Sequence, residues 1–230
     1  MSKKILIVLF VITATFAARA QQVTNQRLFD TIPFIPDHGK ERIAKFEKEP
    51  VTTGKILFLG NSITEGGNWA QLTGDNTVIN RGIGGDITFG ILNRLDDIIK
   101  RKPSKLFLLI GINDIAKDIP DAVIADNCRK IIRRLKAGSP STVIYLQSVL
   151  PVNPSYPNFP QHYDKEDHVI RVNTLYRQVA EELQCKFINL FPLFLDDQQR
   201  LDAKLTGDGL HLNAKGYEIW VNYLKQTGCL

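Results

Sequence analysis

The sequence predicts an α/β protein with one parallel sheet covered by helices, and two observations support this. Short apolar runs alternate with amphipathic stretches from residue 55 onward, as repeated strand–helix–strand units require. The runs are apolar almost without interruption, which is typical of strands buried on both faces. The five predicted strands are Lys55–Gly60, Val78–Gly82, Lys105–Gly111, Thr142–Leu150 and Lys186–Phe194.

Apolar side chains recur at helical spacing between these runs. Three such faces extend from Phe89 to Ile99, from Val169 to Leu183 and from Tyr217 to Leu224. No internal repeat or linker interrupts the alternation. We therefore expect one domain over residues 55–228, preceded by a polar lead-in over residues 21–54.

The first 20 residues are predicted to be a cleavable signal peptide. Two lysines precede an apolar run from Ile5 to about Phe16, and Ala18-Arg19-Ala20 has the small-x-small pattern of a cleavage site. The run is shorter than the ~20 residues that a membrane span needs. Cleavage after Ala20 would make the protein secreted or periplasmic, with no stable membrane insertion. A buried N-terminal helix and an uncleaved anchor are the alternatives.

Charge and cysteine usage exclude several classes of protein. Loss of Lys3, Lys4 and Arg19 would lower the formal net charge from +5 to +2, too little to indicate a nucleic-acid partner. The cysteines are three, with no C-x-x-C, which excludes a disulfide framework and a zinc ribbon. Whether any disulfide forms among them is left open. They are Cys128, Cys185 and Cys229.

Four polar motifs follow predicted strands or precede the last helix. Open α/β sheets bind ligands at the carboxyl ends of their strands, so we expect the motifs to meet there. The motifs are Gly60-Asn61-Ser62-Ile63-Thr64, Asn80–Asp86, Gly111–Asp114 and Asp208-Gly209-Leu210-His211.

The serine of the first motif is a candidate nucleophile. A serine in a tight strand-to-helix turn exposes its hydroxyl, and its backbone N–H can face an oxyanion. Thr64 stands where G-x-S-x-G has its second glycine, so the usual elbow motif is not matched. Taken alone, this pentapeptide favours a plain helix N-cap role for Ser62 over a catalytic one.

The other motifs supply complementary groups. Glycines between Asn80 and Asp86 allow the backbone to approach a ligand closely, and Asn113 can offer a side-chain N–H to the same pocket. On a loop, Asp208 can accept a hydrogen bond from Nδ1 of His211, which leaves Nε2 free to face a serine. Turns and helix caps explain each motif if it is taken singly.

A proline-rich connection over residues 151–166 carries three aromatic candidates: Phe159, His162 and Tyr163. At the end of a strand it would either line a pocket or form a stiff surface connection, and both interpretations are open. Trp69 could wall the pocket, although packing in the core is favoured. Residues 164–168 lack the ligand spacing of a metal site.

Together the four motifs resemble the GDSL/SGNH hydrolase family over about residues 55–220, and the stretch Asn80–Asp86 resembles its platelet-activating-factor acetylhydrolase-like acylesterase branch. The resemblance implies a flavodoxin-like three-layer sandwich with strand order 2-1-3-4-5. One departure is Asn61, which replaces the aspartate that precedes the family's serine. Asparagine keeps the hydrogen-bonding shape and loses a charge.

The resemblance also implies roles at matching positions. Ser62 would be the nucleophile, completed by Asp208 and His211. The oxyanion hole would comprise the N–H groups of Ser62 and Gly85 and Nδ2 of Asn113. No cofactor or metal is implied. The candidate substrate contacts are Asn61, Trp69, Phe159, His162 and Tyr163.

The predicted function is a secreted serine esterase that hydrolyses short acyl esters, acetyl above all, of a small molecule or a glycan. Two alternatives stay open. A lysophospholipase or thioesterase would need an apolar channel for a long acyl chain. A carbohydrate-binding module on an inactive hydrolase scaffold would need no working nucleophile.

Overall fold

The computed structural model describes residues 37–230, and the signal-peptide prediction lies outside them. Five strands, all paired in parallel, form one sheet in the order β2-β1-β3-β4-β5, so the predicted 2-1-3-4-5 order is confirmed. The strands are β1 (Ile56–Gly60), β2 (Ile79–Gly82), β3 (Lys105–Leu109), β4 (Val143–Gln147) and β5 (Lys186–Ile188).

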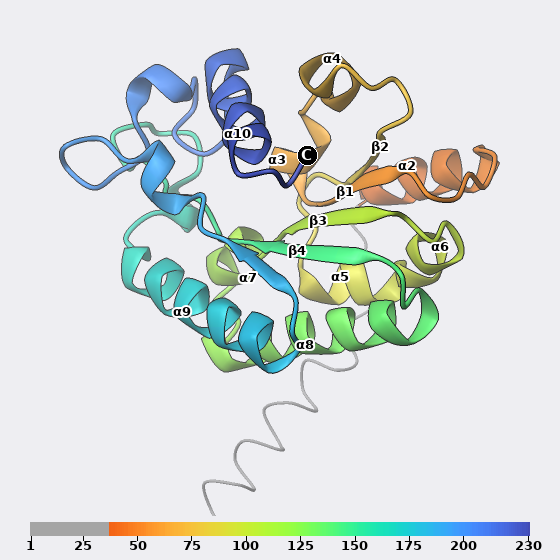
Figure 1. The fold of residues 1–230 in the computed structure, drawn as a ribbon. Helices are drawn as coiled ribbons and strands as arrows, with labels where there is room; N and C mark the ends of the chain where they lie inside the picture. Colours follow the sequence, from red (N-terminus) through yellow and green to blue (C-terminus); the bar gives the residue numbers. More distant parts are fainter. Residues whose placement is uncertain (1–36) are drawn as a thin grey trace, which may run out of the picture. The chain divides into compact units, whose positions relative to one another are not determined.

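Helices cover both faces of the sheet and form the expected three layers (Figure 1). One face carries α3 (Ser62–Glu65), α4 (Trp69–Thr73) and α10 (Ala214–Gln226). The other carries α5 (Thr88–Asn93), α6 (Leu95–Lys100), α8 (Asp121–Gly138) and α9 (Glu166–Glu182). The remaining elements are α2 (Asp37–Lys48), α7 (Ile112–Ala116), and the 3₁₀ turns η1 (Pro160–His162), η2 (Phe191–Phe194) and η3 (Ala203–Leu205).

The fifth strand is shorter than predicted. It ends at Ile188, and the apolar run continues into η2, which contains Pro192. Proline has no backbone N–H for a strand ladder, and Ser148 Oγ accepts the N–H groups of Leu190 and Phe191 instead, each at 2.9 Å. Leu190 and Phe194 are buried in this stretch without belonging to a strand, so burial of apolar residues does not require a strand.

Aromatic side chains form the core on the α10 side of the sheet. The rings of Phe58 and Trp69 stack with centroids 3.8 Å apart and planes 7° apart, and Trp220 contacts both edge-on. Trp69 Nε1 donates to the backbone oxygen of Thr64 at 2.9 Å. Trp69 is 2% exposed, so it packs in the core and does not wall the pocket.

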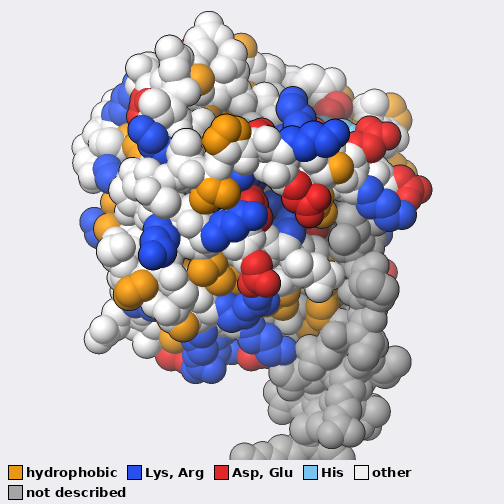
Figure 2. All heavy atoms as spheres, turned by 90° about the vertical axis from the view of Figure 1, so that its right-hand side faces the viewer, with side chains coloured by type: hydrophobic (Ala, Val, Ile, Leu, Met, Phe, Trp, Pro, Cys, Tyr) orange, Lys and Arg blue, Asp and Glu red, His pale blue; other side chains and the backbone are white. Residues whose placement is uncertain are grey.

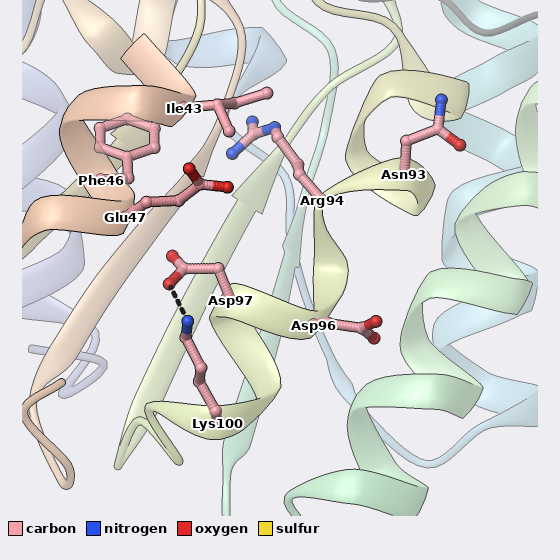
Figure 3. Close-up of a pocket in the computed structure, with 8 residues that line it drawn as sticks. All are labelled: Ile43, Phe46, Glu47, Asn93, Arg94, Asp96, Asp97 and Lys100. Atoms are coloured by element: carbon pink, nitrogen blue, oxygen red, sulfur yellow. Dashed lines mark ion pairs between the residues drawn. The ribbon is translucent and has the colours of Figure 1, made fainter. Parts of the chain in front are cut away.

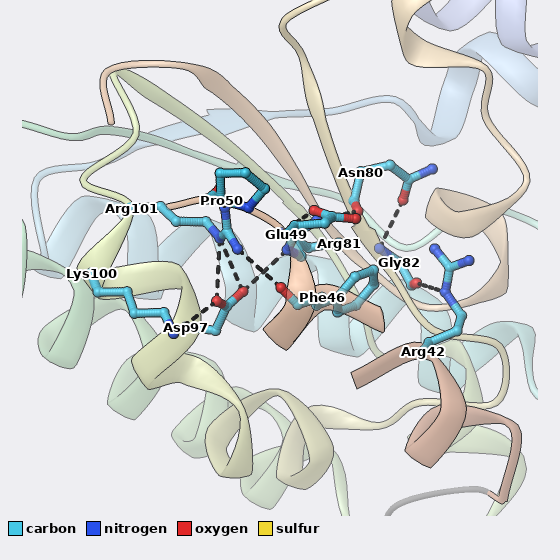
Figure 4. Close-up of polar contacts among 10 residues, drawn as sticks. All are labelled: Arg42, Phe46, Glu49, Pro50, Asn80, Arg81, Gly82, Asp97, Lys100 and Arg101. Carbon is cyan, nitrogen blue, oxygen red and sulfur yellow. Dashed lines mark hydrogen bonds and ion pairs between the residues drawn. The ribbon is translucent and has the colours of Figure 1, made fainter. Parts of the chain in front are cut away.

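Buried arginines join the end of α2 to β2 and α6 (Figure 4). The Arg81 side chain is 2% exposed and pairs with Glu49 at 2.7 Å and with Asp97 at 3.1 Å. Arg101 pairs with the same Asp97 and donates to the backbone oxygen of Phe46. Because an unpaired buried charge is strongly destabilising, these pairs fix α2 against the sheet.

The surface beside α2 and α6 carries side chains of both charge signs (Figure 2). Figure 2 shows acidic and basic side chains interspersed over this face. Within residues 37–230 no helix has the length and apolar character to cross a bilayer. The three cysteines are unpaired, and burial raises the pKa of the Cys128 thiol well above its usual value.

Candidate active site

Ser62 is the first residue of α3, and only Asn61 separates it from the end of β1. Asn61 caps this turn, because its Oδ1 accepts the N–H of Ile63 at 3.0 Å. A side chain at Gly60 would collide with the backbone oxygen of Leu109 and with Thr64, so only glycine permits this tight exit from the strand. Asn61 is fully buried; its side chain holds the turn and does not reach a substrate.

Ser62, His211 and Asp208 form one hydrogen-bonded chain. Ser62 Oγ lies 2.9 Å from His211 Nε2, and His211 Nδ1 lies 2.7 Å from Asp208 Oδ2. The imidazole can therefore accept the hydroxyl proton while the carboxylate holds its other nitrogen.

A compact turn holds Asp208 in place. Its Oδ1 accepts the backbone N–H groups of Leu210 at 3.0 Å and His211 at 2.8 Å. Partial burial raises the pKa of Asp208, but hydrogen bonds from the His211 side chain and from these N–H groups outweigh it and lower the pKa below its usual value. Gly209 has a φ of +83°, and a side chain there would collide with Asn153 and Tyr156. The carboxylate is thus ionised and fixed.

Three N–H groups beside Ser62 are candidate donors to an oxyanion. They belong to the backbones of Ser62 and Gly85 and to Asn113 Nδ2, all from residues that line the same hollow. Within residues 37–230, no acceptor engages the backbone N–H of Ser62 or of Gly85. Asn113 Nδ2 gives one hydrogen to the backbone oxygen of Asp86 at 2.9 Å and keeps a second. This arrangement suits a developing oxyanion.

A buried ion pair ties the donors to the serine turn. Arg94 Nε lies 2.9 Å from Asp86 Oδ2, and Arg94 Nη2 donates to the backbone oxygen of Gly60 at 3.1 Å. Burial raises the pKa of Asp86, and the neighbouring charge of Arg94 opposes that rise. Arg94 breaks the predicted helical face from Phe89 to Ile99 into α5 and α6, since its backbone leaves the helical range.

Glu65 holds the glycine loop on its other side. Its carboxylate accepts the N–H of Gly84 at 2.5 Å and pairs with His38 at 2.9 Å and with Arg42 at 3.2 Å. Arg42 Nε also donates to the backbone oxygen of Gly82 at 2.9 Å (Figure 4). Sequence reasoning missed these groups. The available signal was Glu65, an acidic residue directly after the serine motif.

The cavity at this site has a volume of about 480 Å³. Phe159 and His162 line it, as expected for candidate substrate contacts. Tyr163 does not line it; the phenol donates to the backbone oxygen of Asp208 at 3.3 Å. The complete lining is Ser62, Gly85, Asn113, Ala116, Lys117, Phe159, Gln161, His162, Leu210 and His211.

A second hollow of about 310 Å³ lies between α2 and the α5–α6 segment (Figure 3). It is lined by Phe46, Glu47, Asp97 and Lys100 among others. The candidate triad and oxyanion residues are not part of this lining. In the described part of the chain, no group of three His, Cys, Asp or Glu side chains is placed to hold a metal ion. The candidate chemistry is therefore concentrated at Ser62.

A serine, an imidazole, a carboxylate and oxyanion donors at the edge of a parallel sheet define an acyl-transfer hydrolase as a class. The model of the GDSL-like Lipase/Acylhydrolase family matches residues 58–219. The chain belongs to this family and is a carboxylic ester hydrolase.

Individual relatives agree with this assignment. The chain is 30% identical over 172 residues to an arylesterase of Vibrio mimicus, covering 68% of this chain and 79% of that protein. It is 30% identical, with a TM-score of 0.72, to a Streptococcus pneumonia structure provisionally described as a platelet activating factor; 94% of this chain and 98% of that chain are covered. An acetyl-xylooligosaccharide esterase from Geobacillus Stearmophilus has a TM-score of 0.61 at 20% identity, over 78% of this chain and 97% of that one. That likeness concerns the fold alone.

Proposed function

We propose that this protein is an exported serine esterase that hydrolyses short acyl esters, acetyl above all, through Ser62, His211 and Asp208. The observation that carries the proposal is the continuous hydrogen-bonded chain from the Ser62 hydroxyl to the Asp208 carboxylate. It supports an acyl-enzyme route in two steps.

In the first step, His211 Nε2 takes the Ser62 proton as Ser62 Oγ attacks the ester carbonyl. The tetrahedral oxyanion accepts hydrogen bonds from Ser62 N–H, Gly85 N–H and Asn113 Nδ2. His211 then gives the proton to the departing alcohol, and an acyl-serine remains. Water, deprotonated by the same imidazole, releases the acid and restores the serine.

The cavity supports the preference for a short acyl group. Its volume of about 480 Å³ has to hold both the acyl group and the part of the alcohol near the ester. Its apolar side chains are Ala116, Phe159 and Leu210, and most of the remaining lining is polar. Apolar atoms make up most of the exposed cavity wall, and Lys117, Gln161 and His162 add polar groups that a hydroxylated alcohol such as a sugar can contact.

Export rests on the N-terminal sequence alone, which lies outside the described residues. N-terminal sequencing of protein from the growth medium or periplasm should give Gln21 as the first residue. A chain recovered with residues 1–20 intact would overturn the proposed cleavage.

Fluorophosphonate labelling tests the nucleophile. The wild-type chain should be labelled, and Ser62→Ala should not, because the phosphonate reacts with an activated serine hydroxyl. Ser141→Ala, at an exposed position, is the matched control and should label normally. Persistent labelling of folded Ser62→Ala would remove Ser62 from the mechanism.

A series of nitrophenyl esters from acetyl to palmitoyl, with an acetylated sugar beside it, tests the substrate. A steep fall of kcat/KM beyond butyryl is expected. Rising activity with chain length would favour a lysophospholipase or thioesterase. A folded wild-type protein that turns over none of them would favour the binding module.

A further inference from the structure

His162 lines the cavity and also contacts Asn113, one of the candidate oxyanion donors. It ends η1, in the connection after β4, and is 5% exposed. Its Nε2 lies 3.0 Å from Oδ1 of Asn113, 49 residues earlier in the chain. A buried side chain from a distant segment thus contacts the one oxyanion donor that can rotate.

The partners of Asn113 fix which way its amide faces. The backbone oxygen of Asp86 only accepts hydrogen bonds, so the group 2.9 Å from it must be the amide nitrogen. Oδ1 of Asn113 therefore faces His162, and a carbonyl oxygen needs a donor. It follows that His162 carries a hydrogen on Nε2.

We propose that His162 is a positioning residue: its Nε2–H holds the Asn113 amide so that the second Nδ2 hydrogen points at the oxyanion. The inference rests on the proposed function, because it assigns Asn113 to the oxyanion hole. Without His162 the amide could rotate and present Oδ1, an acceptor, to the developing negative charge.

The surroundings of His162 keep it neutral. Burial, together with the neighbouring His211, Lys165 and Lys117, lowers the pKa of His162 to about 4. Protonation would also place a hydrogen on Nδ1, which has no partner within residues 37–230. The donor to Asn113 therefore stays in one form at neutral pH.

One aromatic ring contacts both imidazoles. Phe159 meets the ring of His162 edge-on at 5.8 Å and the ring of His211 at 5.1 Å. The proline-rich connection therefore packs against the base and the oxyanion donor together, so its η1 turn is part of the site.

A double-mutant cycle tests the proposal. His162→Phe keeps a ring but has no donor, and should lower kcat by between about tenfold and 10²-fold with little change in KM, because a misplaced catalytic group costs up to about that much. His162→Gln can place an amide N–H near the original Nε2 and should stay within about threefold of wild type. In the Asn113→Ala background, His162→Phe should cost less than about twofold more, since its target is gone.

Controls separate this inference from the proposed function. His168→Phe, at an exposed position of α9 where His168 pairs with Asp121, should leave kcat unchanged, and melting curves should show that every variant is folded. Loss of labelling at Ser62 and a kcat effect of Asn113→Ala test the mechanism itself. Equal losses from His162→Phe in both backgrounds, or a loss seen only in KM, would overturn the positioning role.

A readout independent of activity comes from ¹⁵N NMR of the imidazoles. His162 should be neutral and protonated at Nε2 throughout pH 6 to 8. Either the neutral tautomer with its proton on Nδ1 or the doubly protonated imidazolium, found in that range, would contradict the proposal. This test holds even if esterase activity had not been detected.

Discussion

The two halves of the site are built differently. Asp208 and His211 lie in one turn, and a single hydrogen bond joins them to Ser62. The oxyanion half instead depends on segments far apart in the chain: Asn113 is held by Asp86 and His162. We call the first half local, because Asp208 and His211 are neighbours in the chain and only Ser62 comes from a distant segment, and the second half assembled, because the fold brings all its parts together.

This difference predicts how much activity is lost when a residue of either half is replaced. The local half has few parts: Ser62 and His211 exchange the proton and Asp208 holds the imidazole, so losing one should remove most of the activity. In the assembled half, several neighbours share the work of orienting each donor. Losses there should be graded, from the donor itself to the groups that hold it.

The largest loss of kcat among the substitutions that compare the two halves is expected for Asp208→Asn. The amide would present N–H to His211 Nδ1 and favour the wrong tautomer, so kcat should fall by about 10⁴-fold while the protein stays folded. Steady-state kinetics on nitrophenyl acetate measures this, with exposed Asp197→Asn as the matched control. A loss of less than tenfold would show that the carboxylate does not orient the base.

A smaller loss is expected for Asn113→Ala, which removes one donor and leaves two. The cost should be about 10²–10³-fold in kcat, with KM nearly unchanged, because the interaction forms mainly in the transition state. Exposed Asn76→Ala is the control. An unchanged kcat would exclude Asn113 from the oxyanion hole and erase the contrast between the halves.

The sequence predicts the local half better than the assembled one. The strands were predicted because buried parallel strands are continuous apolar runs, and Ser62, Asn113 and His211 lie where such runs end or before the last helix. These positions follow from chain order. The direction of a side chain within a turn depends on the backbone angles, which chain order does not reveal. For this reason the sequence predicts substrate contacts at Asn61 and Tyr163, whereas both side chains lie elsewhere.

Contacts between distant segments left weaker signals. An aromatic side chain near the serine suits a pocket or a core equally well, and only the stack on Phe58 places Trp69 in the core. The helical spacing from Phe89 to Ile99 concealed the break at Arg94, where the backbone leaves the helical range and the side chain pairs with Asp86. No spacing rule links His162 to Asn113.

The graded behaviour of the assembled half can be tested further at Glu65. Glu65→Ala removes the acceptor of the Gly84 N–H and the link to α2, so the glycine loop should loosen and kcat should fall by about tenfold. Glu65→Gln keeps an acceptor and should lose less. Glu182→Ala, which breaks surface pairs with Arg129 and Arg133, should leave kcat unchanged. An equally unchanged Glu65→Ala would mean that the loop holds its own shape.

The smallest expected effect is on the folding stability of the protein, through Asp114, the residue that follows Asn113 in the chain. Asp114 is fully buried, and burial raises its pKa to about 7, although its hydrogen bonds to Thr88 oppose the rise. The folded state thus keeps a proton that the unfolded chain releases near pH 4, so this group lowers stability as pH rises from about 4 through 7.

Asp114→Asn keeps an acceptor for Thr88 and cannot titrate. The Tm of the wild type minus that of Asp114→Asn should therefore become more negative between pH 5 and 8.5, as followed by thermal melting. A difference that stays flat, or that grows more positive with pH, would mean that Asp114 is charged in the folded protein throughout. In that case the residue next to Asn113 would be an ionised carboxylate. Its negative charge would oppose the oxyanion that the assembled half is proposed to stabilise.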